Sequence, residues 1–287
     1  MRLRSLLFVP GDRPERMKKA LQCDADALII DLEDAVTLQS KRLAREMTAA
    51  FLRSAHRRAK LFVRVNPFDS GLLDDDLAAV VAANPDGLLL PKAEGAASVE
   101  ALAAKAPGIP VLPIATETPS AIFELGSYRS VGNLIFGLTW GAEDLPAAIG
   151  ARAARETDGH FTPPYEMVRS LTLFAAHAAG VEAIDTIYPA FHDLKGASDY
   201  AARARRDGFT GMLAVHPTQV SVIHEAFTAT AGELAEARAI VNAFQANPEL
   251  GALNFNGRMI DAPHLKQAKR LLQSVEEWQS ALPADAR

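Results

Sequence analysis

The sequence predicts an α/β protein: a (β/α)8 barrel with a C-terminal helical arm. Short apolar runs recur along the chain, and most of them lack the alternation of apolar and polar residues that marks a half-exposed strand. Such runs are typical of strands that are buried on both faces in a parallel sheet. Stretches rich in Ala, Leu, Arg and Glu separate them, so that strand and helix alternate eight times. This is the count of a TIM barrel, and an open doubly wound sheet is the alternative.

The predicted elements follow one another without a linker. The eight predicted strands are Leu3–Val9, Ala27–Asp31, Leu61–Val65, Gly87–Leu90, Val111–Ala115, Leu134–Gly137, Ala183–Ile187 and Met212–Val215. Helical stretches between them include Pro14–Leu21, Leu38–Leu52, Ser98–Ala104 and Tyr165–Ala179. The longest irregular stretch, about Gly150–Pro164, contains several Gly and Pro residues and is predicted to be an extended loop near the active face.

The C-terminal part of the chain exceeds what a closed barrel needs. After the eighth strand we predict helices at Val220–Ala226 and Glu233–Phe244, then a polar, Gly-containing segment at Asn247–Asp261, and a last helix at Pro263–Leu282. We therefore expect a barrel domain over residues 1–228. Residues 229–287 form an extension that serves as an arm or an oligomer contact.

Composition excludes several classes of protein. The chain has 287 residues, of which 49% are hydrophobic and 23% are charged, which are ordinary values for a globular protein. Its net charge of -5 argues against a general nucleic-acid partner. Cys23 is the only cysteine, so neither an intrachain disulfide nor a Cys-based metal site can form. Neither a signal peptide nor a membrane span is recognisable, so we expect a cytoplasmic protein without a membrane partner.

Ionisable residues follow nearly every predicted strand. In a barrel, the carboxyl ends of the strands surround the active site, so these side chains are expected to converge. Each has a structural alternative: Asp144 could cap a helix, Arg64 could pair with Glu33 or Asp34, and His216 could fix a loop. Together they predict one polar cavity. The residues are Asp31, Glu33, Asp34, Arg64, Lys92, Glu117, Glu143, Asp144 and His216.

Glu117 and Asp144 together suggest a metal site. Two carboxylates without a Cys or an obvious His partner form a hard-oxygen site that suits Mg²⁺. An arginine such as Arg64 opposite the metal would bind a carbonyl or enolate oxygen. Metal and arginine together would stabilise an enolate, the costly intermediate of C–C cleavage next to a carbonyl.

The ordered motifs resemble a known family. Read along the chain, they are Arg4-Ser-Leu-Leu-Phe-Val-Pro-Gly, Asp31-Leu-Glu-Asp-Ala-Val, Val63-Arg-Val-Asn, Leu90-Pro-Lys, Glu117-Thr, Gly141-Ala-Glu-Asp-Leu, Ala183-Ile-Asp and Val215-His-Pro-Thr-Gln. Over about residues 4–280 the chain is similar to the citrate lyase beta-subunit-like proteins of the HpcH/HpaI aldolase and citrate lyase family. The resemblance implies a Mg²⁺-dependent barrel that makes or breaks C–C bonds of acyl thioesters. It also implies a homo-oligomer, commonly a trimer or a multiple of one such as a hexamer.

The resemblance also implies roles for individual side chains. Glu117 and Asp144 match the metal ligands of the family, and Arg64 matches its substrate-binding arginine. Glu33 and Asp34 match the acidic pair that orders this arginine and the waters on the metal.

Two cations and one aspartate complete the assignment. Arg13 and Lys19 lie where relatives hold the phosphates of coenzyme A, although Lys18 is adjacent. Malyl- and citramalyl-CoA lyases carry a C-terminal segment whose aspartate enters the active site of a neighbouring subunit, and Asn256–Asp261 resembles that segment. This places Asp261 in the catalytic position, and the alternative is that Asp261 caps the last helix.

The predicted function is a Mg²⁺-dependent C–C lyase. Its expected substrate is a 3-hydroxy-3-carboxyacyl-CoA such as malyl-CoA, methylmalyl-CoA or citramalyl-CoA, converted through an enolate to an acyl-CoA and a 2-oxo acid, or formed from them. The alternatives are a citrate lyase beta-type subunit that uses a carrier-protein thioester, a class II aldolase for free hydroxy-oxo acids, and a catalytically silent binding protein. One departure bears on the substrate: relatives often have a lysine where this chain has Met212-Leu213.

Overall fold

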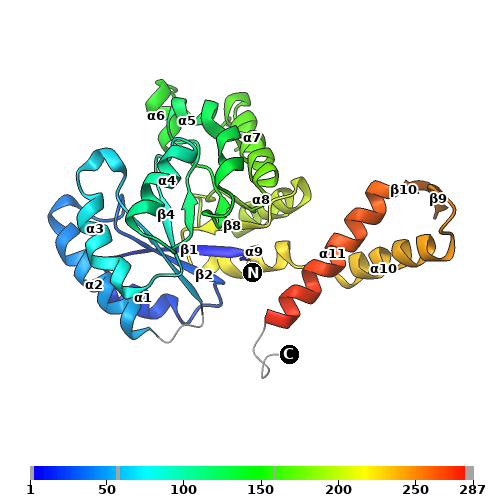
Figure 1. Cartoon of the computed structure of the whole chain (residues 1–287), viewed down its shortest axis with the longest axis horizontal. Coiled ribbons are helices and arrows are strands. Elements are labelled where there is room, and N and C mark those ends of the chain that lie inside the picture. Colours follow the sequence, from blue (N-terminus) through cyan, green and yellow to red (C-terminus); the bar gives the residue numbers. More distant parts are fainter. Residues whose placement is uncertain (1–2, 56–58, 158, 282–287) are drawn as a thin grey trace. The chain divides into compact units, whose positions relative to one another are not determined.

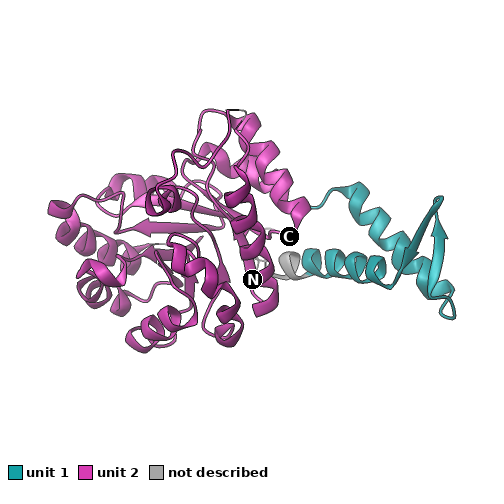
Figure 2. Cartoon of the chain, turned by 90° about the horizontal axis from the view of Figure 1, so that it is seen from above, with its two compact units in different colours: residues 1–2, 228–287 teal, residues 3–227 magenta. Residues whose placement is uncertain are grey.

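The computed structural model describes residues 3–55, 59–157 and 159–281. It divides the chain into two compact units (Figure 2). The barrel unit is Leu3–Phe227, and the C-terminal unit begins at Thr228.

The barrel unit is built on eight parallel strands, in the order β5-β4-β3-β2-β1-β8-β7-β6. They are β1 (Ser5–Pro10), β2 (Ala27–Asp31), β3 (Lys60–Arg64), β4 (Gly87–Leu90), β5 (Val111–Pro113), β6 (Gly137–Leu138), β7 (Glu182–Asp185) and β8 (Gly211–Ala214). Parallel bridges join Val111 to Ile135 and Ile114 to Thr139, so the first and last strands of this order also meet. The predicted (β/α)8 barrel is confirmed.

Helices surround the strands (Figure 1). The α-helices of the barrel unit are α1 (Pro14–Ala20), α2 (Lys41–Ser54), α3 (Leu73–Val80), α4 (Ala96–Lys105), α5 (Pro119–Glu124), α6 (Asp144–Ile149), α7 (Pro163–Ala179), α8 (Leu194–Asp207) and α9 (Thr218–Phe227). Short 3-10 helices are η1 (Leu38–Ser40), η2 (Phe68–Ser70), η3 (Val81–Ala83) and η4 (Leu125–Val131).

Each strand faces two apolar layers. In β2, Ala27 and Ile29 belong to a small cluster that fills the barrel, whereas Leu28 and Ile30 belong to the larger cluster between strands and helices. Successive side chains of a strand point to opposite faces, and here both faces are apolar. This is why the predicted strands lack polar alternation.

The same period of two brings polar side chains to the upper end of the barrel interior. Asp31 follows Ile29 by two residues, and Arg64 follows Phe62 by two, so both continue an inward-facing row. The β2–β3 register pairs Asp31 with Arg64. Their side chains therefore meet where the strands end.

In its described residues, 228–281, the C-terminal unit contains two helices and a hairpin. They are α10 (Ala231–Ala246), β9 (Ala252–Phe255), β10 (Arg258–Asp261) and α11 (Ala262–Ala281). A capping box of Thr230 and Glu233 starts α10. The hairpin lies within Asn247–Asp261, the segment that the sequence marked as polar and Gly-containing. No described helix combines the length and the apolar composition that a bilayer crossing requires.

Candidate active site

A pocket of about 380 Å³ opens at the carboxyl ends of the barrel strands. It brings together six of the nine residues predicted to form one cavity: Asp31, Asp34, Arg64, Glu117, Glu143 and Asp144. They come from segments that follow or end β2, β3, β5 and β6, so the fold gathers side chains that are far apart in the sequence.

Two acidic residues hold Arg64. Its Nε and Nη2 donate to the two carboxylate oxygens of Asp31 over 2.7 and 2.6 Å. Its Nη1 lies 2.8 Å from Oε2 of Glu33, and its guanidinium lies 4.9 Å from the ring centre of Phe8. The guanidinium is therefore fixed in orientation, while donors on both Nη atoms remain for a substrate.

The sequence analysis did not give Asp31 this role. It assigned the ordering of Arg64 to Glu33 and Asp34, but the bidentate partner is Asp31, which also accepts bonds from the backbone N–H groups of Glu33 and Ala35. Alternation along β2 was the signal that could have identified it, because Asp31 lies on the inward face of that strand. Asp34 lies on the pocket wall.

Burial raises the pKa of Glu33 to about 7; the nearby Arg64 opposes this shift, and Asp34 adds to it. This carboxyl therefore lies close to half-protonation near neutral pH.

Glu117 is buried, with 5% of its surface exposed. The backbone N–H of Lys92 donates to its Oε2 over 2.7 Å. Lys92 has a φ of 51°, a left-handed conformation that is strained for a residue with a side chain. Burial, followed by repulsion from Asp144, raises the pKa of Glu117 to about 8.

Thr116 and Gly141 join the segments that carry Glu117 and Asp144. The backbone N–H of Gly141 donates to Oγ1 of Thr116 over 3.2 Å. A Cβ atom at Gly141 would lie 2.7 Å from Cγ and 2.9 Å from Oε1 of Glu117, so only glycine allows this approach. Asp144 begins α6 and leaves about a third of its side chain exposed.

Lys92 is a site residue that the sequence analysis left without a role. Its Nζ lies 3.6 Å from Oε1 of Glu33 and 3.9 Å from Oδ1 of Asp144. The ammonium thus stands between carboxylates that would otherwise repel each other. The sequence feature that could have identified Lys92 as a site residue is its position directly after β4, in Leu90-Pro-Lys.

The donor set fits Mg²⁺ with few protein ligands. Among the described residues, no group of three or more His, Cys, Asp or Glu side chains is arranged to hold a metal ion. Glu117 and Asp144 supply two carboxylates at one pocket wall. Mg²⁺ is commonly bound through one or two carboxylates and keeps its other positions for water and substrate oxygens.

A buried network supports the end of β6. Oδ1 of Asp185 accepts bonds from Nε1 of Trp140 over 2.7 Å and from the Tyr200 hydroxyl over 2.9 Å. Its Oδ2 accepts a bond from Nη2 of Arg169 over 2.8 Å. Trp140 precedes Gly141, so this network fixes the segment that leads to Asp144.

The cation from α1 that lines the pocket is Arg16. Arg13 is exposed, and its Nε lies 3.6 Å from Oδ1 of Asp12. Lys19 is exposed on the same helix. Arg13 and Lys19 are not part of the described pocket lining.

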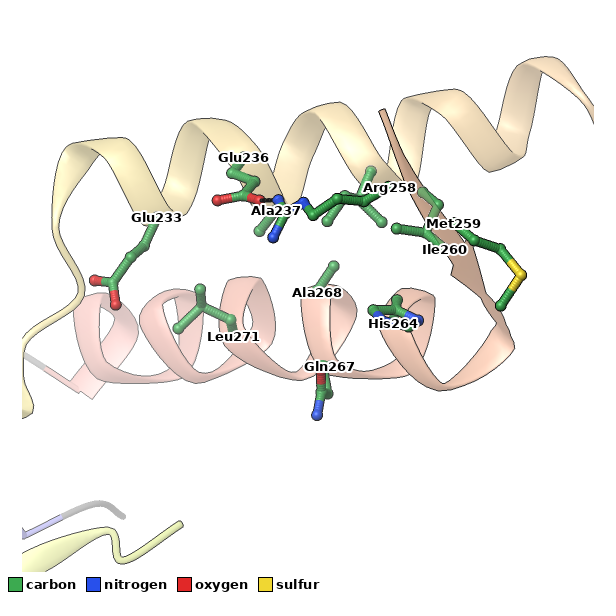
Figure 3. Close-up of a pocket in the computed structure, with 11 residues that line it drawn as sticks. Glu233, Glu236, Ala237, Arg258, Met259, Ile260, His264, Gln267, Ala268 and Leu271 are labelled. Carbon is green, nitrogen blue, oxygen red and sulfur yellow. Dashed lines mark hydrogen bonds and ion pairs between the residues drawn. The ribbon is translucent and has the colours of Figure 1, made fainter. Parts of the chain in front are cut away.

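Asp261 belongs to the C-terminal unit. It ends β10, and its Oδ1 lies 2.6 Å from Nδ1 of His264 in α11. His264 also lines a cavity of about 310 Å³ between α10, β10 and α11, with Glu236, Arg258 and Leu271 around it (Figure 3). Asp261 is thus at the start of the last helix, as the capping alternative requires, and its carboxylate has a histidine partner.

The sequence is similar to those of known proteins over most of its length. Residues 4–217 match the HpcH/HpaI aldolase/citrate lyase family. The chain belongs to this family. It is 32% identical over 286 residues to citrate lyase subunit beta of Escherichia coli K12, covering 95% of this chain and 93% of that protein. It is 30% identical over 292 residues to mitochondrial citramalyl-CoA lyase of Rattus norvegicus, covering 94% of this chain and 85% of that protein.

A solved structure extends the match to three dimensions. The crystal structure of the protein CitE from Mycobacterium tuberculosis, in complex with magnesium, acetoacetate and coenzyme A, matches with a TM-score of 0.84. The two chains are 32% identical, and the match covers 95% of this chain and 97% of that one. The predicted family is confirmed, and with it the predicted class of enzyme, a carbon–carbon lyase.

Proposed function

We propose that this lyase of the HpcH/HpaI family uses Mg²⁺ to cleave, or to form, a 3-hydroxy-3-carboxyacyl-CoA of the malyl, methylmalyl or citramalyl type. The products of cleavage are an acyl-CoA and a 2-oxo acid. The magnesium and coenzyme A in the M. tuberculosis structure support the cofactor and the thioester, and the citramalyl-CoA lyase of rat supports the reaction.

One observation carries the proposal. The guanidinium of Arg64, held by Asp31 and Glu33, shares a single pocket with the carboxylates of Glu117 and Asp144. A pre-oriented guanidinium in one pocket with two carboxylates that can hold Mg²⁺ is an arrangement suited to stabilising negative charge on reacting oxygens.

The chain's own residues can carry out each part of the cleavage. Glu117 and Asp144 would hold Mg²⁺. The bound ion would supply a Lewis acid for the carboxylate and hydroxyl oxygens of the substrate. Arg64 binds the oxygen that becomes the carbonyl of the 2-oxo acid. The hydroxyl proton passes to solvent water, the C–C bond breaks, and its electron pair passes to the thioester as an enolate, so that one proton is released and one is taken up. Protonation of the enolate carbon gives the acyl-CoA.

We assign that protonation to Asp261 of a neighbouring subunit in a homo-oligomer, a trimer or a hexamer. Within the described part of the C-terminal unit, the buried side chains are Ala237, Ile260 and Ala268. So small a core gives little stability by itself. This supports a role for the unit as an arm that packs against another subunit.

The test is mass spectrometry of the full-length protein with Mg²⁺. Acetyl-CoA and propionyl-CoA are each offered with glyoxylate and with pyruvate. We expect a new acyl-CoA whose mass is the sum of the two partners, and none from the Glu117→Gln variant. Absence of product from every pair, with Mg²⁺ shown to bind, would contradict the coenzyme A assignment.

The second candidate is a citrate lyase beta-type subunit that acts on a carrier-protein thioester. The similarity to the E. coli subunit supports it. Product formation from a citryl thioester on an acyl carrier protein, but from no coenzyme A pair, would favour this candidate.

A further inference from the structure

The carboxyl group of Asp261 has a histidine partner within the C-terminal unit. Asp261 is the last residue of β10, and His264 lies three residues later, in the first turn of α11. Side chains at this spacing at the start of a helix are neighbours. Oδ1 of Asp261 lies 2.6 Å from Nδ1 of His264. Within the described part of the chain, no other side chain forms a hydrogen bond with this carboxyl group.

A hydrogen atom must lie between these two atoms, because a bare ring nitrogen and a carboxylate oxygen would repel each other at this distance. An ionised carboxylate can only accept, so Nδ1 of His264 then carries the hydrogen and donates it to Oδ1. The backbone N–H of Asp261 also lies 3.3 Å from Nδ1. The contact with the carboxylate is the shorter of the two, and it therefore determines which ring nitrogen is protonated.

The bond from His264 leaves the second oxygen of Asp261, Oδ2, available. Side chains alternate along β10, so Asp261 shares a face with Met259, whose surface is 70% exposed, whereas Ile260 on the other face is buried. The nearby cation Arg258 donates through its Nη2 to Oε1 of Glu236 in α10 over 2.5 Å. The side chain that acts on Asp261 is therefore the imidazole, and not this guanidinium.

We propose that His264 is a positioning residue for Asp261, an inference that rests on the proposed function. In the cleavage direction, the Oδ2–H bond of Asp261 breaks, a C–H bond forms at the enolate carbon, and the electron pair stays on Oδ2. The Nδ1–H group of His264 holds Oδ1 throughout and stabilises the carboxylate that results. The imidazole itself neither gains nor loses a proton in this step. Condensation reverses the same transfer.

The kinetic test uses full-length variants, Mg²⁺ and the substrate pair that gives product. His264→Leu removes the donor, so it is expected to lower kcat about tenfold or more, with KM and Mg²⁺ affinity changed less than about twofold. His264→Asn can offer an amide N–H near the position of Nδ1 and is expected to recover most of the lost kcat. Gln267→Leu is the matched control and should keep the wild-type kcat, because Gln267 is also exposed on α11 and lines the same cavity.

A double-mutant cycle separates positioning from a general loss of structure. His264→Leu should not lower the residual rate of Asp261→Asn any further, because His264 acts through the Asp261 carboxylate. An equal further loss in that background, a wild-type kcat in His264→Leu, or no recovery in His264→Asn would overturn the proposal. Full turnover in Asp261→Asn would instead contradict the protonation step of the proposed function.

The pair can also be tested without turnover. The chain has seven histidines, so NMR of protein labelled with ¹⁵N-histidine can resolve their ring nitrogens, and the spectrum of His264→Asn identifies the signals of His264. At about pH 8, where an ordinary imidazole is neutral, we expect Nδ1 of His264 to carry hydrogen in the wild type and to lose this preference in Asp261→Ala. A bare Nδ1 in the wild type would overturn the inference even if no substrate pair reacts.

Discussion

Two carboxyl groups of the active site have pKa values shifted toward neutral pH for the same physical reason. Glu33 and Glu117 are both buried among other acidic groups, and their pKa values are raised to about 7 and about 8. A positive ion in the pocket would stabilise both carboxylates. The charges of Arg64 and Lys92 do this only in part, because each is shared among several acids.

Mg²⁺ binding should therefore release a proton. At pH 7 the metal-free Glu117 is mostly protonated, and it must lose its proton to bind the ion, so affinity falls as the pH drops below about 8. We expect the Mg²⁺ affinity to fall about tenfold per pH unit below that value and to level off above it. Calorimetry in buffers of different ionisation enthalpy measures the proton. In Glu117→Gln, residual binding should lose this dependence; an affinity that is constant from about pH 6 to 8 would contradict the assignment.

The Arg64→Lys variant tests whether the site needs the planar guanidinium of arginine, with donors on several nitrogens, or only a positive charge. Lysine keeps the charge but cannot bind both oxygens of Asp31 and still present donors to a substrate. We expect kcat/KM to fall about a hundredfold or more, with the Mg²⁺ affinity changed far less. Steady-state kinetics and metal titration separate the two effects. A lysine variant with nearly full turnover would show that charge alone is needed.

For individual residues, the sequence predicted which chain segments meet at the active site, but not which side chains form hydrogen bonds or ion pairs there. Arg64, Glu117 and Asp144 could be placed in one cavity because they follow barrel strands. The partner of Arg64 could not be chosen among Asp31, Glu33 and Asp34 without knowing the strand register, which pairs Asp31 with Arg64. Likewise, the rotation of α1 about its axis, which brings Arg16 to the pocket, could not be read from the sequence, and the assignment of Arg13 and Lys19 to coenzyme A stays a prediction.

Among the secondary-structure elements, α2 supports the acidic segment after β2. Lys41, the first residue of α2, is buried, and its Nζ donates to the carbonyl oxygens of Leu32 and Glu33 over 2.6 and 2.7 Å. A third bond of 2.8 Å reaches Oδ1 of Asn66, which follows β3. One ammonium thus connects the segment that carries Glu33 with the end of the strand that carries Arg64.

Lys41→Met removes these bonds and keeps the side-chain length. Because three buried acceptors lose a charged donor, we expect about 2 kcal/mol or more of lost stability and a reduced kcat. Chemical denaturation and kinetics measure the two effects. Lys105→Met is the control, since Lys105 pairs with Asp74 at the surface. Equal stability losses in the two variants would contradict a special role for Lys41.

The elements were predictable where their local signals were strong. The barrel strands are apolar on both faces, which distinguishes them from the helices between them. The hairpin of β9 and β10 was missed, although Asn256-Gly257, both with positive φ, is a favoured hairpin turn. The sixth strand was predicted at Leu134–Gly137 but forms at Gly137–Leu138, because pairing with β7, not local propensity, defines so short a strand.

At the level of the whole molecule, the proposed arm means that residues from two chains form each active site. Glu117→Gln and Asp261→Asn should each be nearly inactive alone. Co-expressed in equal amounts, they should recover about a quarter of wild-type activity, because random mixing unites an intact pocket with an intact Asp261 at that frequency. Differently tagged copies, purified for both tags, provide the mixed oligomers, and in a trimer selected in this way about one site in three is intact.

The same mixture distinguishes the two positions of Asp261. If Asp261 acts within its own chain, every mixed site retains one defect and no activity returns. Analytical ultracentrifugation of the wild-type protein would contradict the proposed arm if it found a monomer.

The sequence could predict the barrel from one chain because the core of the barrel lies within that chain. It could not fix the assembly, which depends on surfaces of separate copies.

The left-handed backbone at Lys92 implies a trade between stability and activity. This conformation lets the N–H of Lys92 reach Glu117 while its ammonium reaches Glu33 and Asp144, and it costs about 1 kcal/mol in strain that glycine would not bear. Lys92→Gly relieves this strain but also removes the ammonium that lies between Glu33 and Asp144, so its melting temperature should stay close to that of the wild type while most of its turnover is lost, as thermal denaturation and kinetics would show. A strained backbone that contributes little to stability but places a charge among the acidic groups of the pocket is explained by function.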